Sequence, residues 1–230
     1  MDGSSRPGGR RVSSGKIRFV RYFFAVIALI DYGAGNMHSV EKALRYLGAD
    51  VRRASRPDQL KDAQAAVLPG VGAFDDCVNA LNKQELLRAC RDFISTGRPF
   101  LGICVGYQAL FERSEEFNSC AAGLGAFAGR VVKFSGRDGL KVPQIGWNQI
   151  EFARPDCPIF QGISSGSYVY FVHSFYPQPA DQSIVASRTN YGETFASAIW
   201  KDNVFATQFH PEKSQKVGLQ LLQNFVGLSV

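Results

Sequence analysis

Three short segments of the chain carry residue types that together could support catalysis by a thiol. The first is Gly102-Ile103-Cys104-Val105-Gly106, which follows an apolar run and precedes a helix-like segment. This is the G-x-nucleophile-x-G pattern with cysteine as the nucleophile. The glycines permit a sharp strand-to-helix turn, and the helix N-terminus that follows favours a thiolate over a thiol. A buried core cysteine beside two loop glycines would give the same pattern.

The second segment is His210-Pro211-Glu212, at the end of the apolar run 204–209. Proline favours extended geometry in the residue before it, and positions two apart on an extended chain face the same side. His210 and Glu212 can therefore approach one site, with Glu212 accepting from one ring nitrogen while the other faces a thiolate. The alternative is a surface loop with a chance histidine, although the chain has only three histidines.

The third segment is Pro69-Gly70-Val71-Gly72, which follows the apolar run 65–68. A loop of this composition exposes backbone N–H groups, and those of Val71 and Gly72 could donate to an oxyanion together with Val105. Most Pro-Gly pairs are only turns, so this segment indicates a catalytic loop only in combination with the other two segments. All three follow predicted strands, and the carboxyl ends of parallel strands form one crevice.

Neither a metal nor a cofactor is expected at this crevice. His38 and His173 lack partners at the spacing of metal ligands.

The elements that would position these segments alternate between strand and helix in the first half of the chain. Short apolar runs predict strands at 26–30, 50–53, 65–68 and 100–103. Apolar residues at helical spacing predict helices at 37–47 and 74–95, which end at Gly48 and Gly97. This alternation predicts an α/β fold with a mostly parallel central sheet and helices on both faces.

The second half reads mainly as strands and predicts an antiparallel section. Strand-like runs lie at 131–134, 149–152, 168–175, 183–187, 195–200 and 204–209. Residues 201–203 predict a hairpin turn between the last two, and an amphipathic helix is expected at 217–228.

Composition narrows the class of protein. Of the 230 residues, 45% are apolar and 20% are charged, which excludes a disordered or fibrous chain. No run of 18 apolar residues is present, so no transmembrane helix is expected. The five cysteines include no CxxC pair, which argues against a disulfide framework or a four-thiolate zinc site. Reduced thiols in a cytoplasmic protein are the expectation.

The positive charge is concentrated at the N-terminus. Residues 1–25 hold six of the 26 basic residues and one of the 20 acidic ones, which leaves 20 basic and 19 acidic residues elsewhere. The nearly neutral remainder gives no reason to expect nucleic-acid binding. Residues 1–25 are rich in Gly, Ser and Arg and are expected to form a disordered extension, with a transit peptide as the alternative. Residues 26–230 are then the functional domain.

The sequence resembles the class I, or triad, glutamine amidotransferases, and among them the glutaminase subunits of imidazole glycerol phosphate synthase. Six motifs in family order over residues 26–230 carry the resemblance: DYGAGN (31–36), PGVGAF (69–74), GICVGYQ (102–108), VPQIGWN (142–148), YFVHS (170–174) and QFHPEKSQ (208–215). The nucleophile and HPE motifs are common to class I, whereas DYGAGN, GWN and EKSQ indicate the histidine-biosynthesis branch. Tyr107 and Gln144 depart from the usual Met and His.

The resemblance implies a flavodoxin-like fold and a Cys104-His210-Glu212 triad that releases ammonia from L-glutamine through a thioester on Cys104. It also assigns glutamine binding to Gly70, Gln108, Glu116, His173 and Ser174, the last two through their backbone. The ammonia would pass to a separate cyclase subunit, a (β/α)8 barrel, in a heterodimer. The cyclase would form imidazole glycerol phosphate and AICAR.

Three other functions remain open at this point. A related glutaminase could serve the pyridoxal phosphate, anthranilate or GMP branch, although these lack DYGAGN and GWN. A free-standing thiol hydrolase would be fully active without a partner. A non-enzymatic binding module normally lacks one of the triad residues, and all three are present.

Overall fold

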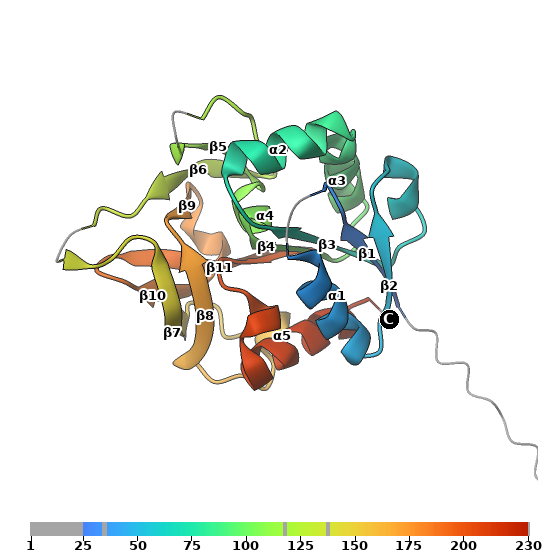
Figure 1. Cartoon of the computed structure of the whole chain (residues 1–230). Coiled ribbons are helices and arrows are strands. Elements are labelled where there is room, and N and C mark those ends of the chain that lie inside the picture. The colour runs from blue at the N-terminus through green and yellow to red at the C-terminus, as the bar shows by residue number, and fades with distance from the viewer. Residues whose placement is uncertain (1–24, 34–35, 117–118, 137–138, 230) are drawn as a thin grey trace, which may run out of the picture.

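The computed structural model describes residues 25–33, 36–116, 119–136 and 139–229 (Figure 1). The expected disordered extension, apart from Ala25, lies outside these ranges. The strands are β1 (Val26–Ile30), β2 (Asp50–Ala54), β3 (Ala65–Gly70), β4 (Phe100–Cys104), β5 (Phe111–Ser114), β6 (Phe127–Lys133), β7 (Gln144–Phe152), β8 (Ser167–His173), β9 (Phe175–Pro179), β10 (Val185–Asn190), β11 (Thr194–Lys201) and β12 (Val204–Thr207). The helices are α1 (Met37–Tyr46), α2 (Phe74–Lys83), α3 (Leu86–Ser95), α4 (Val105–Gln108) and α5 (Gln215–Gly227), with 3-10 turns η1 (Pro57–Leu60), η4 (Pro158–Phe160), η5 (Gln182–Ile184) and η6 (Pro211–Lys213).

A nine-stranded sheet in the order β2-β1-β3-β4-β12-β11-β10-β7-β8 forms the centre of the molecule. The first five strands in this order are parallel, and they follow the doubly wound arrangement of flavodoxin-like folds. Every residue of β3, β4 and β12 is buried, as expected of parallel strands that are covered on both faces. The expected α/β class is confirmed.

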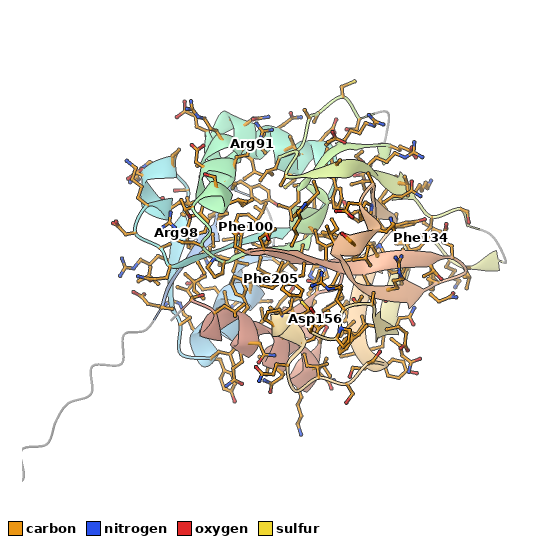
Figure 2. All side chains as sticks on the ribbon, turned by 180° about the vertical axis from the view of Figure 1, so that it is seen from behind. Arg91, Arg98, Phe100, Phe134, Asp156 and Phe205 are labelled. Atoms are coloured by element: carbon orange, nitrogen blue, oxygen red, sulfur yellow. The ribbon has the colours of Figure 1, made fainter. Side chains whose placement is uncertain are left out.

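Helices cover both faces of the parallel half. In Figure 1, α2 and α3 lie on one side of these strands, and α1 and α5 lie on the other. Figure 2 shows the corresponding packing around Phe100 and Phe205, which lie on neighbouring strands. The Phe100 ring contacts Phe93 of α3 with centroids 6.4 Å apart, whereas Phe205 contacts Phe225 of α5 at 6.2 Å. Large aromatic side chains thus fill both helix–sheet interfaces.

The second half of the chain extends the sheet with antiparallel strands, as expected. The pairs β12–β11, β11–β10, β10–β7 and β7–β8 are all antiparallel. The predicted hairpin turn lies between Lys201 and Val204, which pair across β11 and β12. A separate three-stranded sheet in the order β5-β6-β9 packs beside the main one. Among the described residues, no helix combines the length and apolar character needed to cross a membrane.

The single helix expected at 74–95 is wrong, because the chain forms α2 and α3. Glu85 between them adopts a left-handed conformation with φ 59°. Leu81 and Leu86 are five positions apart, so in one continuous helix they would point about 140° from each other. The break lets both leucines reach the core, where both are fully buried.

The strand expected at 168–175 is also two strands. β8 ends at His173 and pairs with β7 in the main sheet, whereas β9 begins at Phe175 and pairs with β6 in the small sheet. Ser174 is the crossing point. The run 168–175 is mainly apolar and is interrupted only by His173 and Ser174, so hydrophobicity alone does not reveal the change of sheet.

Candidate active site

Cys104 occupies a strained turn between β4 and α4. Its φ of 55° and ψ of −110° are unusual for a residue with a side chain. Such a backbone persists only where the surroundings enforce it, and here three glycines do so. A Cβ on Gly106 would lie 1.9 Å from the Leu68 carbonyl oxygen, and one on Gly70 would lie 2.5 Å from the Gly106 nitrogen. A Cβ on Gly102 would meet the Gly106 carbonyl oxygen at 2.8 Å.

These contacts explain why positions 70, 102 and 106 must be glycine. Gly70 is opposite Cys104 in the β3–β4 pairing, so the third segment packs directly behind the nucleophile. The alternative of an ordinary core cysteine does not account for the positive φ. The elbow predicted from the sequence is therefore present.

His210 and Glu212 form a buried pair beyond the end of β12. His210 Nδ1 lies 2.8 Å from Glu212 Oε1, and both side chains are almost fully enclosed. His210 precedes Pro211 and has extended backbone angles, as the sequence predicts. The other ring nitrogen, Nε2, has no hydrogen-bond partner among the described residues. Nε2 is therefore free to exchange a proton with a group in the site.

The electrostatic surroundings favour the protonated form of His210. Burial opposes a charge on the ring, but Cys104 and Glu212 outweigh it and raise the pKa of His210 above its usual value. A cation between a carboxylate and a sulfur is the arrangement that stabilises a thiolate–imidazolium pair. The pair of residues can thus hold the proton that leaves the sulfur.

One cavity of about 350 Å³ brings the predicted residues together. Nine of the eleven line it: Val71, Gly72, Cys104, Val105, Gln108, Glu116, His173, Ser174 and His210. The two exceptions are Glu212, which lies behind His210, and Gly70, which lies behind the elbow. Val105 begins α4, so its N–H belongs to the first turn and lacks an intrahelical acceptor. The cavity is of the size that holds one small molecule.

Two polar side chains flank this cavity. Glu116 Oε2 accepts a hydrogen bond of 2.7 Å from the Phe74 N–H, while burial raises the pKa of the Glu116 carboxyl. Gln108 Nε2 donates to the Phe175 carbonyl at 3.0 Å. Glu116 presents a carboxyl suited to an ammonium group, and Gln108 a fixed amide.

The side chain of His173 has a different place from the one its motif suggests. The ring is buried between the Phe175 carbonyl, 2.9 Å from Nδ1, and Gln144 Oε1, 3.0 Å from Nε2. Burial lowers the pKa of His173 to about 4, so the ring is neutral and its one N–H, on Nδ1, donates to the Phe175 carbonyl. Gln144 and His173 are paired across β7 and β8. The side chain therefore links β7 and β8 beneath the cavity. At this position only the backbone is left to contact a substrate.

Sequence reasoning missed two contacts to the triad. Gln208 Nε2 donates to the Cys104 sulfur at 3.7 Å, and Asn36 Nδ2 donates to Glu212 Oε1 at 3.4 Å. Gln208 lies two positions before His210, so the alternation that linked His210 with Glu212 could have indicated it. Asn36 is distant in sequence, and only the fold brings it to Glu212. The other carboxylate oxygen of Glu212 has no partner among the described residues.

The geometry suits nucleophilic attack on a carbonyl group. It provides a thiol nucleophile, a histidine that holds a proton, an orienting carboxylate and backbone N–H groups beside the sulfur. Across the described ranges, no cluster of three or more His, Cys, Asp or Glu side chains is arranged for a metal ion.

Comparison with known proteins gives a consistent result. The family model for "Glutamine amidotransferase class-I" matches residues 28–227. The imidazole glycerol phosphate synthase subunit HisH of Syntrophotalea carbinolica is 51% identical over 87% of this chain and 98% of its own length. HisH of Thermosynechococcus vestitus is 49% identical, with 88% of this chain and 96% of the relative covered. HisH of Geobacter sulfurreducens is 47% identical, over 86% and 97%.

Solved structures with more distant sequences share the fold. A putative GMP synthase protein from Thermoplasma acidophilum superimposes with a TM-score of 0.66 at 24% identity, covering 90% of this chain and 94% of that one. A PurLQS structure from Thermotoga maritima gives 0.70 at 17% identity, covering 89% and 98%. At these identities the likeness extends to the fold alone.

Proposed function

Because the chain belongs to the class I glutamine amidotransferases, and among them to the HisH subunits of imidazole glycerol phosphate synthase, we propose that it hydrolyses glutamine to supply that synthase with ammonia. The observation that carries the proposal is the joint placement of Cys104 and the buried His210–Glu212 pair at one cavity. That geometry supports the roles proposed below for each residue.

In the first half-reaction, the Cys104 sulfur attacks the side-chain carbonyl carbon of glutamine while its proton passes to His210 Nε2. The resulting oxyanion would be bound by backbone N–H groups at Val71, Gly72 and Val105. Collapse of the tetrahedral intermediate breaks the C–N bond, and His210 returns the proton to the departing ammonia. A γ-glutamyl thioester remains on Cys104. Glu212 keeps His210 oriented and stabilises its charge.

The second half-reaction consumes water. His210 takes a proton from the water as it attacks the thioester, and the proton then passes to sulfur as glutamate leaves. Throughout, the α-amino group of the substrate would lie near Glu116, with Gln108 and the backbone of His173 and Ser174 around its amino-acid end. Gly70 contributes by allowing β3 to approach the elbow closely.

The partner in this proposal is a separate cyclase subunit, a (β/α)8 barrel that forms a heterodimer with this chain. It would use the ammonia to form imidazole glycerol phosphate and AICAR in histidine biosynthesis. An exposed apolar surface on β7 and β8, made of Ile145 (63% exposed), Trp147 (46%) and Tyr168 (56%), supports this docking. Trp147 of this surface belongs to the GWN segment, which is typical of the HisH branch. We place the complex in the cytoplasm, in keeping with the free thiols of Cys77, Cys90, Cys104 and Cys157.

Partner control of the oxyanion site is part of the proposal. Val71 is partly exposed in the loop after β3, between Gly70 and Gly72, and Gly72 has a φ of +87°. A peptide beside glycine can reverse its N–H direction with little strain. Absence of one oxyanion donor slows such reactions by about a hundredfold or more. Binding of the cyclase and its nucleotide would favour the productive direction.

The test is glutamate release by this chain alone, with the cyclase, and with the cyclase and its nucleotide substrate. The proposal expects little release alone and the highest rate with both additions. Equal rates in all three mixtures would instead support the free-standing thiol hydrolase.

A further inference from the structure

The segment that carries the triad histidine presents a second polar side chain to the nucleophile. The chain bends at residues 208 and 209 directly after β12, and the Gln208 N–H donates to the Ser197 carbonyl at 2.9 Å. Phe209 points away into the core, where its ring contacts Phe171. The Gln208 side chain reaches the Cys104 sulfur from this segment, and it is fully buried.

The direction of the Gln208 amide is determined by its neighbours. Gln108 Nε2 lies 3.0 Å from the Phe175 carbonyl, which can only accept a hydrogen bond, so the Gln108 nitrogen must be on that side. The same nitrogen has a second hydrogen and lies 3.3 Å from Gln208 Oε1. Gln208 must then turn its own nitrogen toward Cys104, and Nε2 lies 3.7 Å from the sulfur.

We propose that Gln208 is a positioning residue for the nucleophile: its amide N–H binds the Cys104 sulfur and favours the thiolate, and Gln108 holds that amide in place. The inference rests on the function proposed above, which makes Cys104 the nucleophile. A hydrogen bond to a charged acceptor is stronger than one to a neutral acceptor, so the amide favours the thiolate over the thiol. The amide also restrains the position of the Cys104 sulfur.

The arrangement gives Gln108 two tasks. The residue has been placed beside the substrate on family grounds, yet both hydrogens of its Nε2 point to protein acceptors. Its link to Gln208 thus joins the substrate-binding side of the cavity to the sulfur through two hydrogen bonds. His210 and Gln208 act on the sulfur through different side chains, so their effects on the thiolate can be separated by mutation.

The experiment measures the rate at which iodoacetamide alkylates Cys104 in the full chain between pH 5.5 and 10, with the modified peptide identified by mass spectrometry. The variant is Gln208→Met, which keeps the side-chain length and removes the donor. The matched control is Thr207→Val, which removes one buried hydrogen bond from the neighbouring residue, to the Phe209 carbonyl. The exposed thiol of Cys120 serves as the internal reference in each sample.

We expect Gln208→Met to slow alkylation of Cys104 at pH 7 about three- to tenfold, with the difference shrinking toward pH 10, where the thiolate forms without help. Thr207→Val should follow the unchanged chain at every pH. A Gln208→Met curve that coincides with the unchanged chain, or that is lowered equally at every pH, overturns the inference. Failure of the proposed function gives a different result: Cys104 of the unchanged chain would then react no faster than Cys120 at pH 7. That result would overturn both the proposed function and the role of Gln208.

A second variant covers the case in which Gln208→Met does not fold. Gln108→Met leaves Gln208 in place but removes the donor that orients its amide. It should slow alkylation at pH 7 by a smaller factor, about two- to threefold, again with convergence at high pH. An unchanged pH profile would show that the orientation of Gln208 does not depend on Gln108 and would overturn that part of the inference.

Discussion

The parallel and antiparallel halves of the central sheet contribute to the site in different ways. In the parallel half, the first turn of α4 lies so close to the end of β3 that Gly106 and Gly70 have no room for a Cβ atom. In the antiparallel half, Gly146 on β7 has open space around its Cβ position, and its neighbours Ile145 and Trp147 are exposed. The first region fixes the nucleophile through its backbone, and the second exposes side chains that we propose contact the cyclase. Changes in the two regions should therefore affect different measurements.

The largest effect outside the nucleophile itself is expected at the histidine. His210→Asn should lower glutamine turnover about 10⁴-fold, because the variant loses the imidazole that we propose holds the sulfur's proton. Glu212→Gln should cost only about 10²-fold, since Asn36 and His210 can still donate to the remaining carbonyl oxygen. The measurement is kcat with the cyclase present. A Glu212→Gln variant slower than His210→Asn would reverse the two roles.

Gly106→Ala should be next, because the new Cβ would lie 1.9 Å from a backbone oxygen that cannot move aside. We expect a loss of about 4 kcal/mol in the free energy of unfolding, together with loss of turnover. Gly227→Ala in α5 is the matched control, since nothing lies near its Cβ position, and it should be neutral or slightly stabilising. Denaturant titration compares them, and equal stabilities would show that the elbow is not confined as described.

The pH dependence of stability should report the buried His173. Burial lowers its pKa to about 4 in the folded protein, against about 6.5 in an unfolded chain. The contribution is complete above pH 6.5 and is lost as pH falls toward 4, because only the unfolded chain gains the proton. The loss is about 3 kcal/mol in this window.

His173→Gln should remove that part of the pH dependence, while His38→Gln, at an exposed position on α1, is the control for replacing a histidine. The free energy of unfolding is measured at several pH values between 4 and 7.5. An unaltered slope in His173→Gln would mean that the ring is protonated in the folded protein.

The smallest expected effect concerns Trp147 on β7, and it should distinguish the antiparallel half of the sheet from the catalytic half most clearly. Trp147→Ala should weaken cyclase binding by about 2 kcal/mol, roughly thirtyfold, because an exposed tryptophan at a docking surface is a common energetic anchor. Glutamate release by the isolated chain and its thermal midpoint should not change. Tyr46→Ala, which removes a more exposed aromatic side chain on α1, is the control and should leave cyclase affinity intact. Equal affinities for both variants would move the docking surface elsewhere.

The sequence predicted the catalytic half of this comparison more completely than the rest. Cys104, His210 and Glu212 are identifiable because glycine and proline next to them in the sequence constrain the local backbone. The parallel arrangement of the first strands followed from the alternation of strand and helix. The division into α2 and α3 did not, because Glu85 carries no signal for a left-handed conformation.

Long-range contacts were beyond the sequence patterns. Gln144 and His173 meet only because β7 and β8 pair, and Asn36 reaches Glu212 across 176 positions. The small sheet of β5, β6 and β9 was missed because β5 is four residues long and two of its residues are exposed. The third strand of this sheet, β9, was missed because it begins only one residue after β8 ends, within the single strand predicted at 168–175. Each of these features depends on residues that the fold, rather than the chain order, makes neighbours.

The central claim is that Cys104 releases ammonia that the cyclase then uses, and Cys104→Ser tests it most directly. The assay measures imidazole glycerol phosphate formed by the variant with the cyclase and its nucleotide, first with glutamine and then with an ammonium salt. We predict that synthesis from glutamine falls at least about a thousandfold, because a hydroxyl is a much weaker nucleophile in a site suited to a thiolate. Synthesis from ammonium should stay within about twofold of the unchanged complex. Substantial synthesis from glutamine by the serine variant would contradict the account.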